Sequence, residues 1–427
     1  MNRIIFNELS LWKKSKKRKP LILQGARQVG KTWVMKEFGK REFKKTVYLN
    51  FESSTRIKNM FVADFEIDRI MQIIEIESGE KIIPATTLII FDEIQEAEKG
   101  IIALKYFYKN APQYYIIAAG SLLGVALQKN NSFPIGKVDL FKIFPMNFFE
   151  FLMAGGNEKL LELLVAKKWN IIESYHDFLV DQLRLYYFIG GMPEAVAEYF
   201  DSKNLKEVRK IQEKILNGYE SDFYKHTPKE IVPRIRMVWN GILGQLAKEN
   251  KKFFFGQIKS GARSKEFEIA IQWLTDAGLL IKVNRINNGK IPLKSYCQQE
   301  MFKLFLHDVG LLNAMTGLPA ELVLEKNTIL TEYKGALTEQ FVCQELYQHY
   351  VPYYWSPENA RAEVDFVIQR EKEIIPIEVK AEENLKSKSL GVFAEKYQIK
   401  KPIRTSMNKY RKESWMENVP LYAVGNL

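Results

Sequence analysis

The sequence predicts an α/β protein that begins with a mainly parallel β-sheet, continues with a helical segment and a winged-helix module, and ends with another α/β domain. Over residues 1–149, apolar runs typical of buried strands alternate with helical patterns, and this alternation favours parallel strands joined by helices. A glycine-bracketed turn joins the first apolar run, residues 21–24, to the helical pattern that follows it. Near the C-terminus, strand-like runs at 362–369 and 374–381 are separated by a short charged turn, which indicates a hairpin in the last domain.

Composition narrows the class of protein and the kind of partner. The chain has 427 residues, of which 46% are apolar and 13% aromatic, which is enough for filled cores in about three domains. A formal net charge of +12 favours polyanionic partners such as DNA or RNA. The two cysteines, Cys297 and Cys343, lack the spacing of a disulfide framework or a zinc site, so we expect a cytoplasmic location. No apolar run reaches the roughly 18 residues of a membrane span, so we expect no secretory leader and no membrane partner.

The glycine-bracketed turn matches the Walker A pattern GxxxxGK[ST] at every fixed position. Its glycines allow backbone amides to turn inward around a phosphate, and the start of the following helix adds a positive dipole. Lys31 would reach the terminal phosphates, and Thr32 would offer its hydroxyl to Mg²⁺. A plain strand-to-helix turn with a surface lysine is the alternative. The predicted nucleotide-binding residues are Gly25, Ala26, Arg27, Gln28, Val29, Gly30, Lys31, Thr32 and Trp33.

A second apolar run, residues 87–91, ends in two adjacent carboxylates. Ligands of open α/β sheets bind at the carboxyl ends of such strands. Asp92 would therefore assist Mg²⁺, and Glu93 would orient and deprotonate the water that attacks the terminal phosphate. The two carboxylates could instead cap the next helix. Because the Walker A motif occurs in the same chain, we favour a catalytic role. A third strand, 114–121, ends in Ser121, which would sense the terminal phosphate or simply open a turn.

Two further strands are expected at 46–52 and 138–144, and the motifs together resemble a known family. GARQVGKT, LIIFDEIQ, AAGSL and KVDLFKIFPMNFFEFL, in this order, resemble the AAA-type P-loop ATPases of a large prokaryotic family with a C-terminal domain of unknown function. YYFIGGMPEAV, KLFLHDVGLL and GALTEQFVCQEL are similar to that family too. The resemblance implies an ASCE-like P-loop NTPase fold that uses ATP and Mg²⁺. Where such proteins often carry Gly-Arg, this chain has Gly136-Lys137, so an arginine-finger role is not carried over.

The middle of the chain is predicted to be helical and then to contain a winged helix. Residues 150–215 have the three-and-four apolar spacing of an amphipathic bundle, which would form a lid. In 216–297, helix candidates at 237–250, 255–261 and 264–278 precede a ribbon, with strands at 279–286 and 291–298 flanking the turn 287–290. If the winged helix binds DNA, the backbone phosphates would be contacted by three basic residues of the ribbon, Lys282, Arg285 and Lys290. If it instead binds a protein, we expect no phosphate contacts.

The last block, 298–427, carries a second set of chemically interesting residues. Glu339 lies in a predicted helix, Asp365 in one strand of the hairpin, and Glu378 and Lys380 in the other. This order resembles the PD-(D/E)xK signature of the restriction-endonuclease-like fold. The resemblance implies that the carboxylates hold Mg²⁺ and that Lys380 activates water for attack on a phosphodiester. These charges could also be the solvated fringe of a sheet edge.

The sequence thus predicts an ATP-binding, ATP-hydrolysing AAA-type protein with four parts, 1–149, 150–215, 216–297 and 298–427. Its predicted catalytic residues are Lys31, Glu93 and Ser121. One alternative is a nucleotide-gated, Mg²⁺-dependent nuclease that acts on DNA or RNA. Another is a switch that binds nucleotide without hydrolysis and recruits a protein partner or a second copy of itself. A small-molecule kinase is disfavoured, because Glu93 is placed for water and no acceptor pocket is evident.

Overall fold

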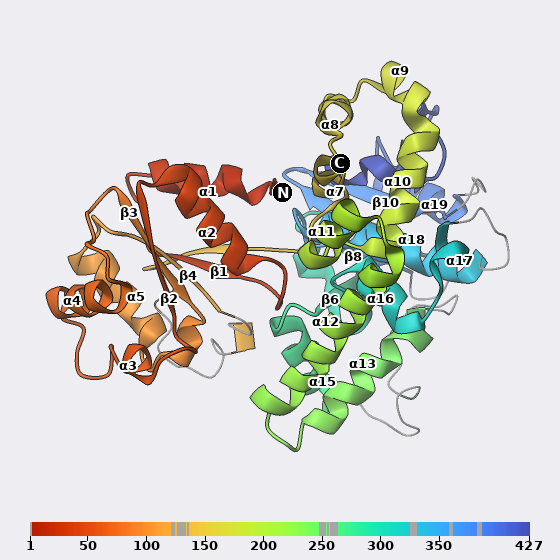
Figure 1. Cartoon of the computed structure of the whole chain (residues 1–427). Helices are drawn as coiled ribbons and strands as arrows, with labels where there is room; N and C mark the ends of the chain where they lie inside the picture. The colour runs from red at the N-terminus through yellow and green to blue at the C-terminus, as the bar shows by residue number, and fades with distance from the viewer. Residues whose placement is uncertain are drawn as a thin grey trace. The chain divides into compact units, whose positions relative to one another are not determined.

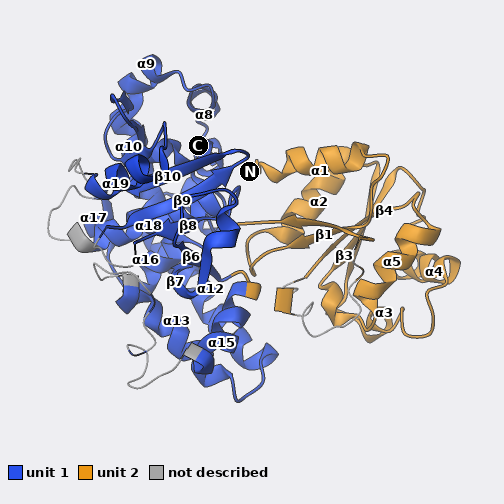
Figure 2. Cartoon of the chain, turned by 180° about the vertical axis from the view of Figure 1, so that it is seen from behind, with its two compact units in different colours: residues 1, 145–275, 279–427 blue, residues 2–144, 276–278 orange. Residues whose placement is uncertain are grey.

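The computed structural model divides the chain into two compact units (Figure 2). The N-terminal unit comprises residues 2–144 with 276–278, and the larger unit comprises 145–275 with 279–427. The structure describes residues 2–120, 124–125, 134, 136–246, 253, 256, 264–324, 331–357, 362–381 and 387–427.

The N-terminal unit is built on a five-stranded sheet whose neighbouring strands are all parallel, which confirms the prediction. The strand order is β2-β3-β4-β1-β5, so β4 lies between the two strands that end in the nucleotide motifs. All six residues of β3 are buried, as an apolar run in a doubly covered sheet requires. The strands are β1 Leu21–Gln24, β2 Lys45–Asn50, β3 Thr87–Asp92, β4 Tyr115–Ala119 and β5 Asp139–Lys142.

Helices cover both faces of this sheet (Figure 1). On one face, α4 and α5 enclose a core that contains Phe51, Phe61, Phe91 and Phe107. On the other face lie α1 and α2, whose buried residues include Trp12 and other large apolar side chains. Because residues alternate between faces along each strand, both faces of the central strands are apolar. The helices are α1 Ile5–Lys14, α2 Lys31–Glu42, α3 Thr55–Lys58, α4 Ile67–Ser78 and α5 Gly100–Asn110, with the 3-10 turn η1 Ile94–Glu96.

The larger unit contains an eight-stranded mixed sheet of order β12-β13-β11-β10-β9-β8-β6-β7. The predicted ribbon forms its β6–β7 edge, and β6 also pairs in parallel with β8, so the ribbon shares a sheet with the C-terminal strands. The second ribbon strand does not begin at 291 as predicted, because residues 293–296 form a 3-10 turn. The strands are β6 Leu280–Ile286, β7 Cys297–Leu306, β8 Tyr353–Trp355, β9 Val364–Arg370, β10 Glu373–Val379, β11 Ile403–Ser406, β12 Arg411–Lys412 and β13 Glu417–Pro420.

Helices make up much of the rest of the larger unit, including the predicted helical stretch between 150 and 215. The helix candidate at 255–261 lies outside the described residues, apart from Gly256. Among the helices that the structure describes, none combines the length and the hydropathy of a membrane span. The helices are α7 Phe148–Ala154, α8 Glu158–Val165, α9 Trp169–Ile172, α10 His176–Ile189, α11 Pro193–Ser202, α12 Leu205–His226, α13 Val232–Leu246, α15 Ser264–Asp276, α16 Val309–Thr316, α17 Ala320–Leu324, α18 Thr331–Tyr347 and α19 Lys388–Tyr397, with 3-10 turns η2 Glu173–Tyr175, η3 Leu293–Tyr296 and η5 Leu421–Asn426.

Buried carboxylates tie these helices together. Glu345 of α18 accepts a hydrogen bond from the backbone N–H of Phe148, the first residue of α7, at 3.1 Å. Asp308 caps the start of α16 and also accepts the N–H of Gly191 at 2.6 Å. Burial raises the pKa of Glu345 to about 8 and that of Asp308 to about 6. The helix packing therefore depends on groups whose charge state differs between the folded and the unfolded chain.

Candidate functional site

The glycine-bracketed turn lies between β1 and α2, where the sequence predicts a phosphate cradle. Gly25 allows close packing, because a Cβ atom there would lie 2.2 Å from the carbonyl oxygen of Ile143. Gly30 has a φ of 91°, a left-handed conformation that favours glycine, and α2 begins at the next residue. The amides of the first helical turn are therefore available to an anion. Trp33 of this turn is exposed, and its ring centroid lies 6.0 Å from that of Phe6.

The side chain of Lys31 lies inside the loop. It is 6% exposed, and its ammonium donates hydrogen bonds to the carbonyl oxygens of Gly25 and Ala26, at 3.0 and 2.8 Å. Burial lowers the pKa of Lys31 to about 8, against the attraction of Glu93 and Asp92. An anion bound at the loop would replace the carbonyl oxygens as the partner of this ammonium. Its negative charge would then balance the buried positive charge of Lys31.

Thr32 and Asp92 are 60 residues apart in the sequence but meet in the structure. The Thr32 hydroxyl donates a hydrogen bond to Oδ2 of Asp92 at 2.8 Å, and Asp92 is 3% exposed. Hydroxyl and carboxylate oxygens are ligands that Mg²⁺ prefers, and Mg²⁺ at a nucleotide uses one or two protein groups together with phosphates and water. No group of three or more His, Cys, Asp or Glu able to hold a metal occurs among the described residues. A nucleotide-bound Mg²⁺ needs no such group, so the residues present fit it.

Glu93 follows Asp92 with a backbone φ of 52°, which is unusual for a residue other than glycine. Strained conformations of this kind occur preferentially at functional sites. Oε2 of Glu93 accepts a hydrogen bond from the side-chain amide of Gln95 at 2.6 Å, which fixes the carboxylate. The third predicted catalytic residue, Ser121, lies outside the described residues.

Three supporting residues of this site were not predicted from the sequence. Gln95 donates the hydrogen bond that fixes the Glu93 carboxylate. The only indication of it in the sequence is its position in the FDEIQ stretch. Tyr48 of β2 donates its hydroxyl to Oδ2 of Asp92 at 2.9 Å, because β2 pairs with β3. Arg3 is buried and donates to the carbonyl oxygens of Val29, at 3.0 Å, and of Phe144. The sequence gives no signal for Arg3, since its partners are distant in the chain.

The C-terminal candidate residues also come together. The β9–β10 register places Phe366 opposite Ile377, which sets Asp365 opposite Glu378. Oδ2 of Asp365 accepts the backbone N–H of Val379 at 2.7 Å, and Glu378 pairs with Lys380 at 2.8 Å. Burial, with the nearby charge of Glu339, raises the pKa of Asp365. Burial also raises the pKa of Glu378, in spite of Lys380.

A buried lysine that was not predicted lies among these carboxylates. Lys303 of β7 is 1% exposed, and its ammonium is 2.6 Å from Glu363 and 3.9 Å from Glu339. Burial lowers the pKa of Lys303, but Glu363, Glu339 and Asp365 outweigh it, so the pKa lies above its ordinary value. The cation among the carboxylates is therefore an ammonium, and no metal position of three or more carboxylates is found in the described part of the chain. As arranged, the cluster does not fit a divalent ion, and nuclease chemistry stays a prediction.

The predicted phosphate contact of Arg285 on the β6–β7 ribbon is wrong. Its guanidinium is buried and donates to the carbonyl oxygen of Ser356 at 2.9 and 2.5 Å, so it is held inside the sheet. Lys282 is half-buried over the ring of Phe302. Lys290 is exposed in the connection after β6.

Comparison with known families agrees with the geometry of the N-terminal site. Residues 17–152 match an AAA domain, residues 180–322 match a domain of unknown function (DUF8612), and residues 334–424 match another (DUF4143). The N-terminal unit thus carries an AAA-type P-loop domain, which supports nucleotide binding and ATPase activity. No curated protein matches the sequence.

Three solved structures are distantly similar to the chain. A Walker-type ATPase of Pyrococcus abyssi is 12% identical, with a TM-score of 0.44 over 73% of this chain and 94% of that one. Orc1 of Aeropyrum pernix, solved in complex with DNA, is 12% identical, with a TM-score of 0.29 over 75% and 92%. Cdc6p of Pyrobaculum aerophilum is 11% identical, with a TM-score of 0.26 over 75% and 94%. At scores this low, these similarities add nothing to an assignment of function.

Proposed function

We propose that the N-terminal unit binds ATP with Mg²⁺ and hydrolyses its terminal phosphate. The observation that carries the proposal is the contact between Thr32 and Asp92 beside the buried ammonium of Lys31. A hydroxyl, a carboxylate and an ammonium meet at the carboxyl ends of two parallel strands, where an open sheet binds its ligand. The match of residues 17–152 to an AAA domain supports the same function.

Each residue of the site then has a defined task. The backbone amides of the loop and of the first turn of α2 bind phosphate oxygens, and Lys31 neutralises their charge. Thr32 and Asp92 would hold Mg²⁺, which neutralises charge on the phosphates during transfer. Glu93, held by Gln95, orients the attacking water and accepts its proton.

The test compares two variants of the site with a matched control. Lys31→Ala removes the buried ammonium, and Glu93→Gln keeps the shape of that side chain but cannot accept the proton. Lys40→Ala, at an exposed lysine of the same helix, is the control. We expect ATP binding, measured by calorimetry, to be lost only in Lys31→Ala. We expect phosphate release to fall at least about a hundredfold in both site variants, in keeping with the loss of a general base, and to be unchanged in the control.

Two results would contradict the proposal. If the native chain releases phosphate no faster than Glu93→Gln does, the carboxylate has no role in hydrolysis. If the native, folded chain shows no binding heat with ATP and Mg²⁺, the loop is not a nucleotide site. Binding without turnover would instead support a switch that uses nucleotide only to change shape.

A further inference from the structure

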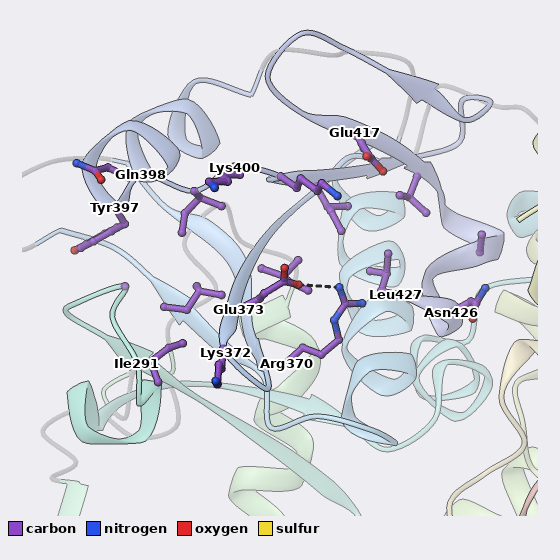
Figure 3. Close-up of a pocket in the computed structure, with 18 of the residues that line it drawn as sticks. Ile291, Arg370, Lys372, Glu373, Tyr397, Gln398, Lys400, Glu417, Asn426 and Leu427 are labelled. Carbon is purple, nitrogen blue, oxygen red and sulfur yellow. Dashed lines mark hydrogen bonds and ion pairs between the residues drawn. The ribbon is translucent and has the colours of Figure 1, made fainter.

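A large cleft lies at the end of the eight-stranded sheet where β9 turns into β10 (Figure 3). Its volume is about 920 Å³, which is near the top of the range of about 300–1,000 Å³ for ligand sites. Arg370 and Glu373 line it, whereas Asp365 and Glu378 lie at the other end of the same hairpin. Ile375, which also lines the cleft, is three residues or about 10 Å from Glu378 along β10, and no carboxylate of the cluster that contains Asp365 and Glu378 lines the cleft.

The rim of the cleft is strongly basic. Six lysine or arginine residues line it, against two glutamates. One glutamate, Glu373, forms an ion pair with Arg370 at 3.1 Å. The other, Glu417, accepts a hydrogen bond from the hydroxyl of Tyr410 at 3.4 Å. The lysines are exposed, and no carboxylate lies within ion-pair distance of them among the described residues. An excess of solvated positive charge around one hollow favours a ligand with several phosphates. These lysines are Lys167, Lys290, Lys372, Lys400 and Lys401.

Apolar and aromatic side chains also line the cleft, and an inorganic anion would not need them. Isoleucine side chains from β10, from the connection after α19 and from β11 line it. Trp169 and Tyr410 also line it and stack on each other, with ring centroids 4.4 Å apart and planes within 6°. Both rings are partly exposed, as is that of Tyr397. The cleft therefore offers cations at the rim and flat apolar surfaces inside.

We propose that this cleft binds single-stranded nucleic acid, with the rim lysines on its phosphates and the aromatic rings against its bases. Single strands present both features at once, since their bases are unpaired and can stack on aromatic side chains. In a duplex the faces of the bases are covered, so the aromatic interior would find no partner. An acidic peptide would match the lysines but not the stacked rings. This site is independent of the proposed ATPase.

The first test changes the charge of the rim. Lys372→Glu, Lys400→Glu and Lys401→Glu are combined in one variant of the full chain. The control combines Lys159→Glu, Lys206→Glu and Lys225→Glu, three exposed lysines of the same unit that do not line the cleft. Binding of a fluorescently labelled oligothymidylate is measured by anisotropy at several salt concentrations, without ATP.

We expect the rim variant to bind at least about tenfold more weakly than the control. We also expect its slope of log affinity against log salt to fall by about 2, because each phosphate contact on a single strand contributes about 0.7. Equal losses in the two triple variants, or an unchanged slope, would overturn the proposal. Single variants Lys290→Glu and Lys372→Glu provide the same comparison if the triple variant folds poorly.

The second test examines the rings. Tyr410→Ala should weaken binding about tenfold, as loss of one stacked base does, while Tyr410→Phe should bind like the native chain. A duplex of the same length should bind more weakly than the single strand and should not respond to Tyr410→Ala. A duplex that binds as tightly as the single strand would exclude the proposed ligand class. Competition by inorganic phosphate as effective as that by the unlabelled oligonucleotide would show a small-anion site instead. Because ATP is absent from the binding assay, failure of the proposed ATPase does not affect the result.

Discussion

Replacing Lys303 by methionine keeps an unbranched side chain only one atom shorter but removes a buried positive charge from the carboxylate cluster. The ammonium is 1% exposed and 2.6 Å from Glu363, with Glu339 3.9 Å away. Removing one partner of a buried ion pair leaves an uncompensated charge and typically costs about 3–5 kcal/mol. Glu363 is more exposed than the lysine and can gain some hydration, so we expect a loss of about 3 kcal/mol in the free energy of unfolding.

Urea denaturation followed by tryptophan fluorescence measures this loss. Five of the seven tryptophans belong to the same unit as Lys303, so the signal reports mainly on that unit. Lys372→Met, at an exposed lysine of the β9–β10 turn, is the control and should change stability by less than about 0.5 kcal/mol. The double variant Lys303→Met with Glu363→Gln should recover part of the loss, because the nearest carboxylate is then neutral.

A loss in Lys303→Met no larger than that of the control would refute the account of the cluster as a buried ion-pair network. Mg²⁺ provides a second check. We expect millimolar Mg²⁺ to leave the stability of the variant unchanged, since the carboxylates as arranged do not fit a divalent ion. If Mg²⁺ restored stability, the carboxylates would be a metal site in which the lysine takes the place of the ion.

Three more predictions concern single groups. The folded chain holds a proton on Glu345 up to a pKa of about 8, whereas the unfolded group loses it near 4.5, so stability falls as pH rises between these values. Between about pH 6 and about pH 8, the free energy of unfolding of the native chain, measured by urea titration, should fall by about 2 kcal/mol more than that of Glu345→Gln. Equal pH profiles of the two proteins would contradict the raised pKa of Glu345. Gly25→Ala should abolish ATP binding in calorimetry, because its Cβ would lie 2.2 Å from the Ile143 carbonyl oxygen, and unchanged affinity would show that the loop adapts. Tyr48→Phe removes a hydrogen-bond donor to Asp92 and should lower the free energy of unfolding of the N-terminal unit, measured by thermal denaturation, by about 1–2 kcal/mol. A loss no larger than experimental error would mean that Thr32 alone holds the carboxylate.

The parts of the nucleotide site that could be predicted are local in the sequence. The glycines of the loop, Lys31 and Thr32 lie within one short motif, and the run that ends in Asp92 has the apolar character of a doubly covered strand. Parallel strands place their carboxyl ends along one edge, so the meeting of Thr32 with Asp92 followed from the fold class.

The supporting residues could not be predicted, because their partners are distant in the chain. Tyr48 reaches Asp92 only because β2 pairs with β3, and Arg3 reaches Val29 only through the packing of the N-terminal unit. The predicted ribbon strand at 291–298 was displaced by a 3-10 turn. Arg285 is buried, and its guanidinium donates to the carbonyl oxygen of Ser356, a partner 71 residues away that the pairing of β6 with β8 brings close.

The sequence by itself determined the parallel sheet, the phosphate loop and the identity of the acidic residues, because strand periodicity and a tight glycine turn are properties of adjacent residues. Only the tertiary structure decided that an ammonium lies among the C-terminal carboxylates and that basic and aromatic side chains from segments far apart in the chain gather around one cleft. Both features arise from pairing between segments far apart in the chain, where burial and charge depend on neighbours that no local pattern specifies.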